Sequence, residues 1–365
     1  MKSKIVLFAI AGLLFAGLAG AQEQPEKKET DPKETGQSGW TKKNRLEFQT
    51  ADGQFSLRLG ILGQFLYTAI DPDVGDSESS FRTRRVRPDL RGKLFGSVGY
   101  RLQYELAGSP SLLDFYLNWG PDSAKLQAGQ FKAPFGRQEL TSIAKQHFVD
   151  RSIASARFAP SRQQGLALLG KNAGSTFEYG IGVFNGNGRN RSSDDNSEKM
   201  IAGRAVFNLL GSYDLDESAL DYPDSPRLSF GFAGLSNTDG EGVDAVDITR
   251  FGVELAFKVQ GLSFISEFYQ EQASPDVGDD LDTDGLYAQL GYLFPGKRLE
   301  LALRHAFISP DVAGGSADQT ETGVALNFYI NKHGQKVQMD YRQLEFDADP
   351  SRDRAELRVQ AQITF

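Results

Sequence analysis

The sequence predicts an all-β protein, a transmembrane antiparallel β-barrel of 16 strands with one long constriction loop inserted into it. Three observations predict this fold. Apolar and polar residues alternate in many short segments, short and long connections alternate between those segments, and no long apolar run follows the N-terminus. Alternation with a period of two is the pattern of a strand with one apolar and one polar face.

The N-terminus has the pattern of a secretory signal peptide. Two lysines within Met1–Lys4 precede an apolar run over 5–19, which Ala19-Gly20-Ala21 closes as a small-residue cleavage site. This run is shorter than the about 20 apolar residues that a transmembrane helix needs. We therefore expect residues 1–21 to be cleaved off during export.

A polar stretch separates this signal from the first alternating segment. Residues 22–52 are rich in Glu, Lys, Gln, Thr and Pro, so we expect a disordered periplasmic lead-in that buries little apolar surface. The alternating pattern begins near Gly53, which assigns residues 53–365 to the barrel. Because the chain has no cysteine, this exported fold must hold together without disulfides, as a large closed sheet can.

Sixteen alternating segments can be counted in the barrel region. In one of them, Leu299, Leu301 and Leu303 share one face, and Arg298, Glu300 and Arg304 share the other. The count is even, as bacterial outer-membrane barrels require. The expected strands are 54–68, 80–95, 98–107, 111–119, 124–131, 165–171, 175–184, 199–210, 227–236, 247–259, 261–272, 284–293, 297–308, 320–330, 334–346 and 353–365.

The connections alternate between short and long, as periplasmic turns and outside loops do. Gln260-Gly261 is an expected periplasmic turn, and 185–198 is an expected outside loop. Two connections depart from the rule: 211–226 is long for a periplasmic turn, and 108–110 is short for an outside loop. The longest connection, 132–164, follows the fifth strand, and we expect it to fold into the barrel and narrow it.

Basic residues concentrate in the second expected strand. Val86, Leu90 and Leu94 have the lipid-facing parity, so the side chains between them point into the lumen; these are Arg85, Arg87, Asp89, Arg91 and Lys93. We expect acids of neighbouring strands, such as Glu105 and Asp114, to neutralise part of this charge. The remaining basic excess would line one wall of the lumen.

The long connection is basic as well. It contains Lys132, Arg137, Lys145, Arg151, Arg157 and Arg162, against Glu139 and Asp150. A narrow pore that is basic on both sides would attract anions and exclude cations, because low-dielectric walls concentrate the field.

Several motifs resemble those of the phosphate-selective porin O/P family. They are FRTRRVRPDLRGKLFGSVGYRLQYEL from Phe81, AGQFKAPFGRQELTS from Ala128, FVDRSIASARFAPSRQQGLAL from Phe148, then GVFNGNG and the final AQITF. The resemblance spans residues 53–365 and is strongest over 81–171. It implies homotrimers of sixteen-stranded barrels in the outer membrane of a Gram-negative-type bacterium. It also implies a water-filled, anion-selective channel for passive uptake of phosphate or similar small anions.

The same motifs imply residue roles. Arg85 corresponds to a strand arginine of the family's pore and Arg151 to the loop arginine at its constriction, and Lys145 lies one position from the family's constriction lysine. Together with the parity argument, they predict a set of pore-lining or anion-binding residues: Arg85, Arg87, Arg91, Lys93, Arg137, Lys145, Arg151 and Arg157. No metal or cofactor is expected.

Two alternatives stay open: a general diffusion porin without strict phosphate preference, and a mainly structural outer-membrane barrel. Acidic outside loops conflict with strict phosphate preference; they include Asp71, Asp73, Asp76, Glu78, Asp239, Glu241, Asp244, Asp276, Asp279 and Asp280. These side chains can instead solvate the loops or bridge divalent cations to lipopolysaccharide. At physiological salt their field is screened over about 8 Å, so it would not reach a mid-pore constriction.

Other classes of function find no support in the sequence. The chain has three histidines and neither a Gly-x-Ser-x-Gly nor a His-Glu-x-x-His motif, so we expect no enzyme. A formal net charge of −8 argues against nucleic acid as a partner. Phe365 ends the last alternating strand and resembles the C-terminal signal that the outer-membrane assembly machinery recognises. The expected surroundings are therefore outer-membrane lipid and lipopolysaccharide.

Overall fold

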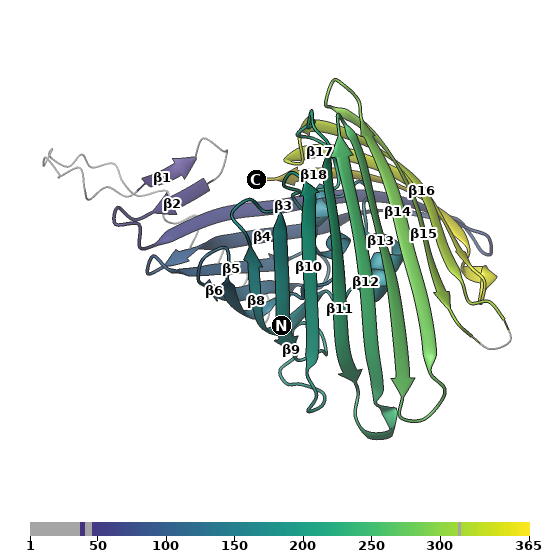
Figure 1. Ribbon diagram of the computed structural model, residues 1–365. Helices are drawn as coiled ribbons and strands as arrows, with labels where there is room; N and C mark the ends of the chain where they lie inside the picture. The colour runs from purple at the N-terminus through teal and green to yellow at the C-terminus, as the bar shows by residue number, and fades with distance from the viewer. Residues whose placement is uncertain (1–36, 41–45, 313–314) are drawn as a thin grey trace, which may run out of the picture. The chain divides into compact units, whose positions relative to one another are not determined.

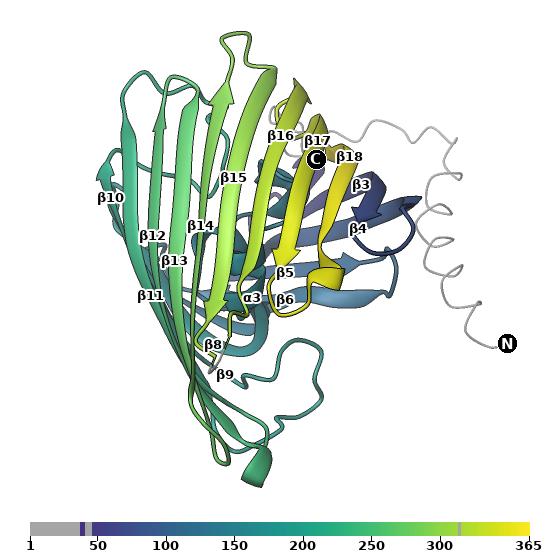
Figure 2. The ribbon, with the colours of Figure 1, turned by 90° about the vertical axis from the view of Figure 1, so that its right-hand side faces the viewer.

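The computed structural model describes residues 37–40, 46–312 and 315–365, so the expected signal peptide lies outside the described part. Sixteen antiparallel strands, β3 to β18, close into a barrel in which β18 pairs with β3 (Figures 1 and 2). The expected segments are confirmed, with ends that differ by a few residues. The strands are β3 (Ser56–Pro72), β4 (Glu78–Leu94), β5 (Val98–Glu105), β6 (Ser111–Trp119), β7 (Lys125–Lys132), β8 (Arg162–Lys171), β9 (Phe177–Phe184), β10 (Met200–Leu210), β11 (Arg227–Asp239), β12 (Val246–Val259), β13 (Leu262–Pro275), β14 (Leu281–Leu293), β15 (Leu299–Pro310), β16 (Gln319–Asn331), β17 (Gln335–Phe346) and β18 (Arg354–Thr364).

Two short strands precede the barrel, β1 (Gln37–Trp40) and β2 (Leu46–Gln49). β2 pairs with the first four residues of β3, whereas β18 pairs with β3 from Leu62 onward and Phe365 exchanges backbone hydrogen bonds with Ile61. β2 therefore covers the edge of β3 that β18 does not reach. An unpaired strand edge presents free N–H and C=O groups, and pairing with another strand satisfies them. These strands replace part of the irregular lead-in expected over 22–52; its other residues up to 45 are not described.

The barrel buries polar side chains and exposes apolar ones, the reverse of a water-soluble protein. On β15, Leu301 and Leu303 are 40% and 51% exposed, whereas Glu300 is fully buried. The same alternation runs through β16 and β17. An outward apolar face and a polar interior are the signature of a barrel in lipid. None of the described helices is long and apolar enough to cross a membrane.

The connection between β7 and β8 folds into the lumen, as expected. It contains α2 (Arg137–Leu140), the 3₁₀ helix η2 (Ile143–Lys145) and α3 (Ile153–Phe158), which Figure 2 shows inside the barrel. We call residues 133–161 the inserted loop. Its backbone donates hydrogen bonds to carboxylates of the wall: the amide of Val149 to Asp340 on β17 (2.8 Å) and that of Ile153 to Glu321 on β16 (2.9 Å). The inserted loop is thereby fastened to the β11–β18 side.

A second segment also folds inward, from the periplasmic end. Residues 211–226, the connection that is too long for a turn, bury Glu217 and Ser218 to about 1% exposure. Glu217 accepts hydrogen bonds from the side chain of Gln138 (3.0 Å) and the amide of His147 (2.7 Å). The ordinary turn at Gln260-Gly261 has two positive φ angles, as tight hairpins require. The long segment instead serves as a support beneath the inserted loop.

Glycines on the wall make room for the large side chains of the inserted loop. A Cβ added to Gly285 on β14 would lie 2.2 Å from the ring of Phe158, which is fully buried and stacks on Tyr269 with ring centroids 5.3 Å apart. A Cβ added to Gly291, further along β14, would lie 2.8 Å from His147. The loop therefore approaches this strand more closely than any other residue type would allow.

Gly285→Ala tests this close approach. The methyl group should displace Phe158 and cost about 1–3 kcal/mol, as overpacking of a filled interior does. The expected result is a lower temperature for loss of the folded, heat-modifiable form on gel electrophoresis, together with noisier single-channel current. Gly234→Ala on β11 is the control, because an added Cβ there meets no atom within 4 Å. Equal behaviour of the two variants would show that the loop does not press on β14.

A buried charged cluster also holds the inserted loop. His147 has no exposed surface, and its ring lies 3.3 Å from Glu300 on β15 and 3.9 Å from Glu217. Burial lowers the pKa of His147, but the two carboxylates outweigh burial, so its pKa is raised above the ordinary value. The protonated imidazole therefore joins the loop, the wall and the segment 211–226.

The raised pKa of His147 gives stability a pH dependence. The stabilisation is complete below the ordinary histidine pKa of about 6.5 and is lost as pH rises through the higher pKa of the folded state. We expect the thermal midpoint of the barrel to fall between pH 7 and pH 9 more in the wild type than in His147→Gln. His305→Gln, whose side chain is exposed, should keep the wild-type slope. A slope unchanged in His147→Gln would contradict this assignment.

Candidate functional site

Arg85, Arg87 and Arg91 of β4 point into the lumen, as the alternation predicts. Arg87 pairs with Glu105 at 2.7 Å, and Asp89 accepts from Arg91 and, at 2.7 Å, from Arg101 on β5. The expected neutralisation by Glu105 is therefore present. Asp114 on β6 pairs instead with Arg101 at 3.1 Å and with Arg162 at 2.7 Å.

A β-bulge places two adjacent arginines on the same carboxylate. The register between β3 and β4 shifts at Gln64/Phe65, so that Arg84 has no partner residue on β3. Arg84 and Arg85 both reach Asp150 of the inserted loop, at 3.1 and 2.6 Å. Strict alternation would send Arg84 to the lipid side; the bulge redirects it, as bulges do next to functional sites.

The narrow space between the inserted loop and the β3–β8 wall forms a cavity of about 330 Å³, which we call the constriction cavity. One carboxylate, Asp114, lines it, against six basic side chains: Arg85, Arg87, Arg101, Lys132, Arg151 and Arg162. Arg151 comes from the inserted loop and bonds Glu139 at 2.9 Å and the backbone carbonyl of Gln138 at 3.2 Å. Those bonds fix Arg151 on the loop side of the cavity.

Positive charge exceeds negative charge around this cavity. Eight basic side chains share five carboxylates in the ion pairs described. The basic ones are Arg84, Arg85, Arg87, Arg91, Arg101, Lys132, Arg151 and Arg162, and the acidic ones are Asp89, Glu105, Asp114, Glu139 and Asp150. Pairing therefore orders the arginines without cancelling their charge.

Two further cavities continue toward the periplasmic end. The middle cavity, about 410 Å³, shares Arg87 and Arg101 with the constriction cavity and adds Arg58, Arg91 and Lys145. The exit cavity, about 530 Å³, is also lined by Lys145. The shared side chains make one row of basic groups from the constriction to the exit.

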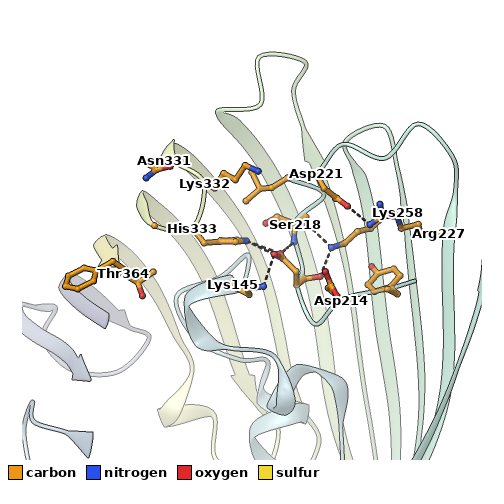
Figure 3. A pocket seen from close by; sticks show the side chains of 15 residues that line it. Lys145, Asp214, Ser218, Asp221, Arg227, Lys258, Asn331, Lys332, His333 and Thr364 are labelled. Carbon is orange, nitrogen blue, oxygen red and sulfur yellow. Dashed lines mark hydrogen bonds and ion pairs between the residues drawn. The ribbon is translucent and has the colours of Figure 1, made fainter. Parts of the chain in front are cut away.

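The exit cavity is mixed in charge (Figure 3). Asp216 accepts a hydrogen bond from His333 at 3.0 Å and pairs with Lys145 at 3.5 Å, and its backbone carbonyl accepts from Lys258 at 2.7 Å. Burial raises the pKa of Asp216, but His333, Lys258 and Lys145 outweigh it and leave this pKa below its ordinary value. Asp216 is therefore ionised, and it offsets part of the positive charge at the exit.

The predicted site residues fall into two groups. Arg85, Arg87, Arg91, Lys145 and Arg151 line one or more of the three cavities. Lys93, Arg137 and Arg157 line none of them. Lys93 is exposed near the periplasmic turn, and Arg157 pairs bidentately with Glu271 on β13.

Arg137 differs most from the expectation. Its side chain is 3% exposed and bonds Glu254 on β12 at 3.1 Å and Ser229 on β11 at 2.6 Å. Glu254 also pairs with Arg204 at 2.6 Å, so Arg137 is the second cation on this buried carboxylate and docks the loop on the wall.

Four basic residues of the constriction and middle cavities were missing from the predicted site: Arg58, Arg101, Lys132 and Arg162. The sequence pattern could have identified Arg58 and Arg101, because both have lumen-facing parity in their strands. Lys132 and Arg162 pair with each other in register at the ends of β7 and β8, where the inserted loop leaves and rejoins the wall. Their role depends on the loop's position, which parity does not reveal.

Comparisons with known proteins agree with this architecture. The family model of phosphate-selective porins O and P matches residues 55–365. A sequence comparison with curated proteins gave no significant match.

Among solved structures, an anion-selective porin from Comamonas acidovorans is similar at 14% identity and a TM-score of 0.66, over 86% of this chain and 100% of that one. The outer-membrane channel DcaP of Acinetobacter baumannii matches at 12% identity and 0.59, over 86% and 98%. The trimer form of OmpT from Vibrio cholerae matches at 9% identity and 0.59, over 85% and 99%. At these identities the structures establish a shared fold. The extent of the family match establishes that this chain is an outer-membrane porin and belongs to the phosphate-selective porin O and P family.

Proposed function

We propose that this porin is an anion-selective channel for passive uptake of phosphate or chemically similar oxyanions. The observation that carries the proposal is the excess of basic side chains over carboxylates around the constriction cavity. The surrounding protein and lipid have a low dielectric constant, so the field of the unpaired charge is concentrated in the aqueous path. An anion gains free energy there and a cation loses it.

The residue types favour oxyanions. A guanidinium presents its N–H groups in a planar fork that matches two oxygens of one anion, and seven of the eight shared basic side chains are arginines. Passage also requires release, which several moderate sites allow better than one tight pocket. The row from Arg85 through Arg87 and Arg101 to Lys145 offers such successive sites. Sulfate and small carboxylates share this chemistry and should also permeate.

The alternatives predict different currents. A general diffusion porin would pass chloride without block by phosphate, and a structural barrel would carry no ionic current. One further feature supports a conducting path: the three cavities share lining residues. We regard the cleaved signal peptide, lipopolysaccharide contact and recognition of Phe365 by the assembly machinery as parts of the same proposal. Passive conduction requires no catalytic step.

Arg151→Glu tests the assignment of the constriction. Two unit charges 4 Å apart interact by about 4 kcal/mol at an effective dielectric constant of 20, so reversing one charge there should matter. We expect the zero-current potential in a KCl gradient to shift toward cation selectivity, with a roughly tenfold lower anion-to-cation permeability ratio. Block of chloride current by phosphate should weaken in parallel.

The matched control is Arg189→Glu, the same charge reversal at an exposed residue of the outside loop 185–198. It should change both quantities much less. Arg151→Gln, which adds no second carboxylate beside Glu139, provides a milder change if the reversal prevents assembly. Wild-type selectivity and wild-type phosphate block in the Arg151 variants would remove this arginine from the constriction.

We also propose a homotrimer, with the outer face of β6–β9 as the contact. All four of these strands are shorter than those of β11–β16: β7 and β9 have 8 residues, whereas β13 has 14. Their outward residues include the exposed Phe115, Ile181 and Val183. The mass of the detergent-solubilised protein, measured by light scattering, should equal three chains. Ile181→Arg should reduce it to one chain, and a monomeric wild type would contradict the proposal.

A further inference from the structure

A carboxylate of the protein itself occupies the point where three arginines meet. Asp150, on the inserted loop, accepts hydrogen bonds from Arg85 Nη2 at 2.6 Å and Arg84 Nη2 at 3.1 Å through one oxygen. Its other oxygen accepts from Arg358 Nη1 on β18 at 3.1 Å. This is the arrangement in which arginines hold two oxygens of a bound oxyanion.

The cluster keeps a positive excess even with Asp150 in place. Arg358 has a second carboxylate partner, Asp340, at 2.7 Å. In the ion pairs of the described residues, Arg84 and Arg85 have Asp150 alone. Two guanidinium groups thus share one carboxylate. Burial disfavours ionised Asp150, but Arg85, Arg358 and Arg84 outweigh it and lower its pKa below the ordinary value.

The cluster is open to the lumen at Asp150, Arg84 and Arg85, whereas Arg358 is buried behind them. The side chains of Asp150 and Arg84 are 25% and 32% exposed, and Arg85 lines the constriction cavity beside Arg87 and Arg151. The loop main chain at Asp150 is held independently of its carboxylate, because its carbonyl accepts from Arg304 at 3.1 Å and the neighbouring amide of Val149 donates to Asp340. The carboxylate could therefore be replaced without loss of these anchors.

We propose that Asp150 is a specificity-determining residue: its carboxylate acts as a tethered competitor for the oxyanion site formed by Arg84, Arg85 and Arg358. The inference rests on the proposed anion selectivity and adds the residue that limits how tightly an oxyanion binds. A permeating oxyanion must share the arginines with Asp150 or displace it, so each gained contact is offset by a lost one. Binding stays weak, and release stays fast, which a channel requires.

The test uses Asp150→Asn in the full-length protein in planar bilayers, with inorganic phosphate as the probe. The amide keeps the size of the side chain and removes its charge. The phosphate concentration that half-blocks chloride current should fall about tenfold, and dwell times of the blocked state should lengthen by a similar factor. Removal of a structural contact alone would not tighten binding.

Two further variants make the result specific. Asp221→Asn removes one negative charge beside Arg227 at the exit cavity and should leave phosphate block at the wild-type level. Arg84→Gln should weaken phosphate block several-fold alone, and in the Asp150→Asn background it should cancel the gain. If Asp150→Asn does not assemble, the single variant Arg84→Gln provides the test. Phosphate block equal to that of the wild type would then overturn the oxyanion site.

The outcomes separate this inference from the function on which it rests. An anion-selective, phosphate-blocked wild type whose block is unchanged or weaker in Asp150→Asn would overturn the role of Asp150 and leave the proposed function intact. Equal tightening in Asp221→Asn would also overturn it, because the effect would then follow total charge. A wild type without anion selectivity or phosphate block would overturn both proposals.

Discussion

The architecture depends on the docking of a polar segment against buried carboxylates. The β12–β17 wall carries six acidic side chains that face inward and are almost fully buried: Glu254, Glu267, Glu271, Glu300, Glu321 and Asp340. A buried charge is costly unless it is paired and hydrogen-bonded. Arginines of the wall pair with four of these carboxylates: Arg204, Arg250, Arg304 and Arg358. The inserted loop adds further partners through Arg137, His147 and Arg157 and through backbone amides.

This docking divides the lumen unequally. Because cations of the wall and of the loop together neutralise the buried carboxylates, that side becomes a filled polar core. The opposite side, formed by β3–β8, keeps arginines that have too few carboxylates, and the constriction cavity and the middle cavity lie there. The chain as a whole is acidic, with a net charge of −8, and still concentrates positive charge at its narrowest part. The position of the charged side chains, and not the net charge of the chain, determines whether the pore attracts anions or cations.

The strands and the lumen-facing side chains could be predicted because a strand imposes a strict period of two. This argument predicted that the side chains of Arg85, Arg87 and Arg91 face the lumen, and they do. It failed at Arg84, where a bulge breaks the period. It also could not assign Arg137, because the choice between the cavity and Glu254 depends on how a loop meets a strand 117 residues away.

The inward fold of residues 211–226 could not be predicted for the same reason. Its excess length was visible in the sequence, but its partners, Gln138 and His147, lie in a distant connection. Fold similarity at 14% identity or less shows that the barrel tolerates extensive change in its residues. In the proposed function, selectivity depends on a few guanidinium groups and the carboxylates that hold them. Family membership therefore accounts for the barrel, and we attribute the choice of permeating ion to individual contacts.

The most direct test of the account is the zero-current potential of the wild-type channel across a tenfold KCl gradient. A positive excess at the constriction predicts a potential close to the chloride equilibrium value, which moves toward zero as phosphate blocks the conducting anion path. A potential near zero without phosphate, or one of the sign that potassium produces, would contradict the claim that the unpaired arginines govern which ion enters.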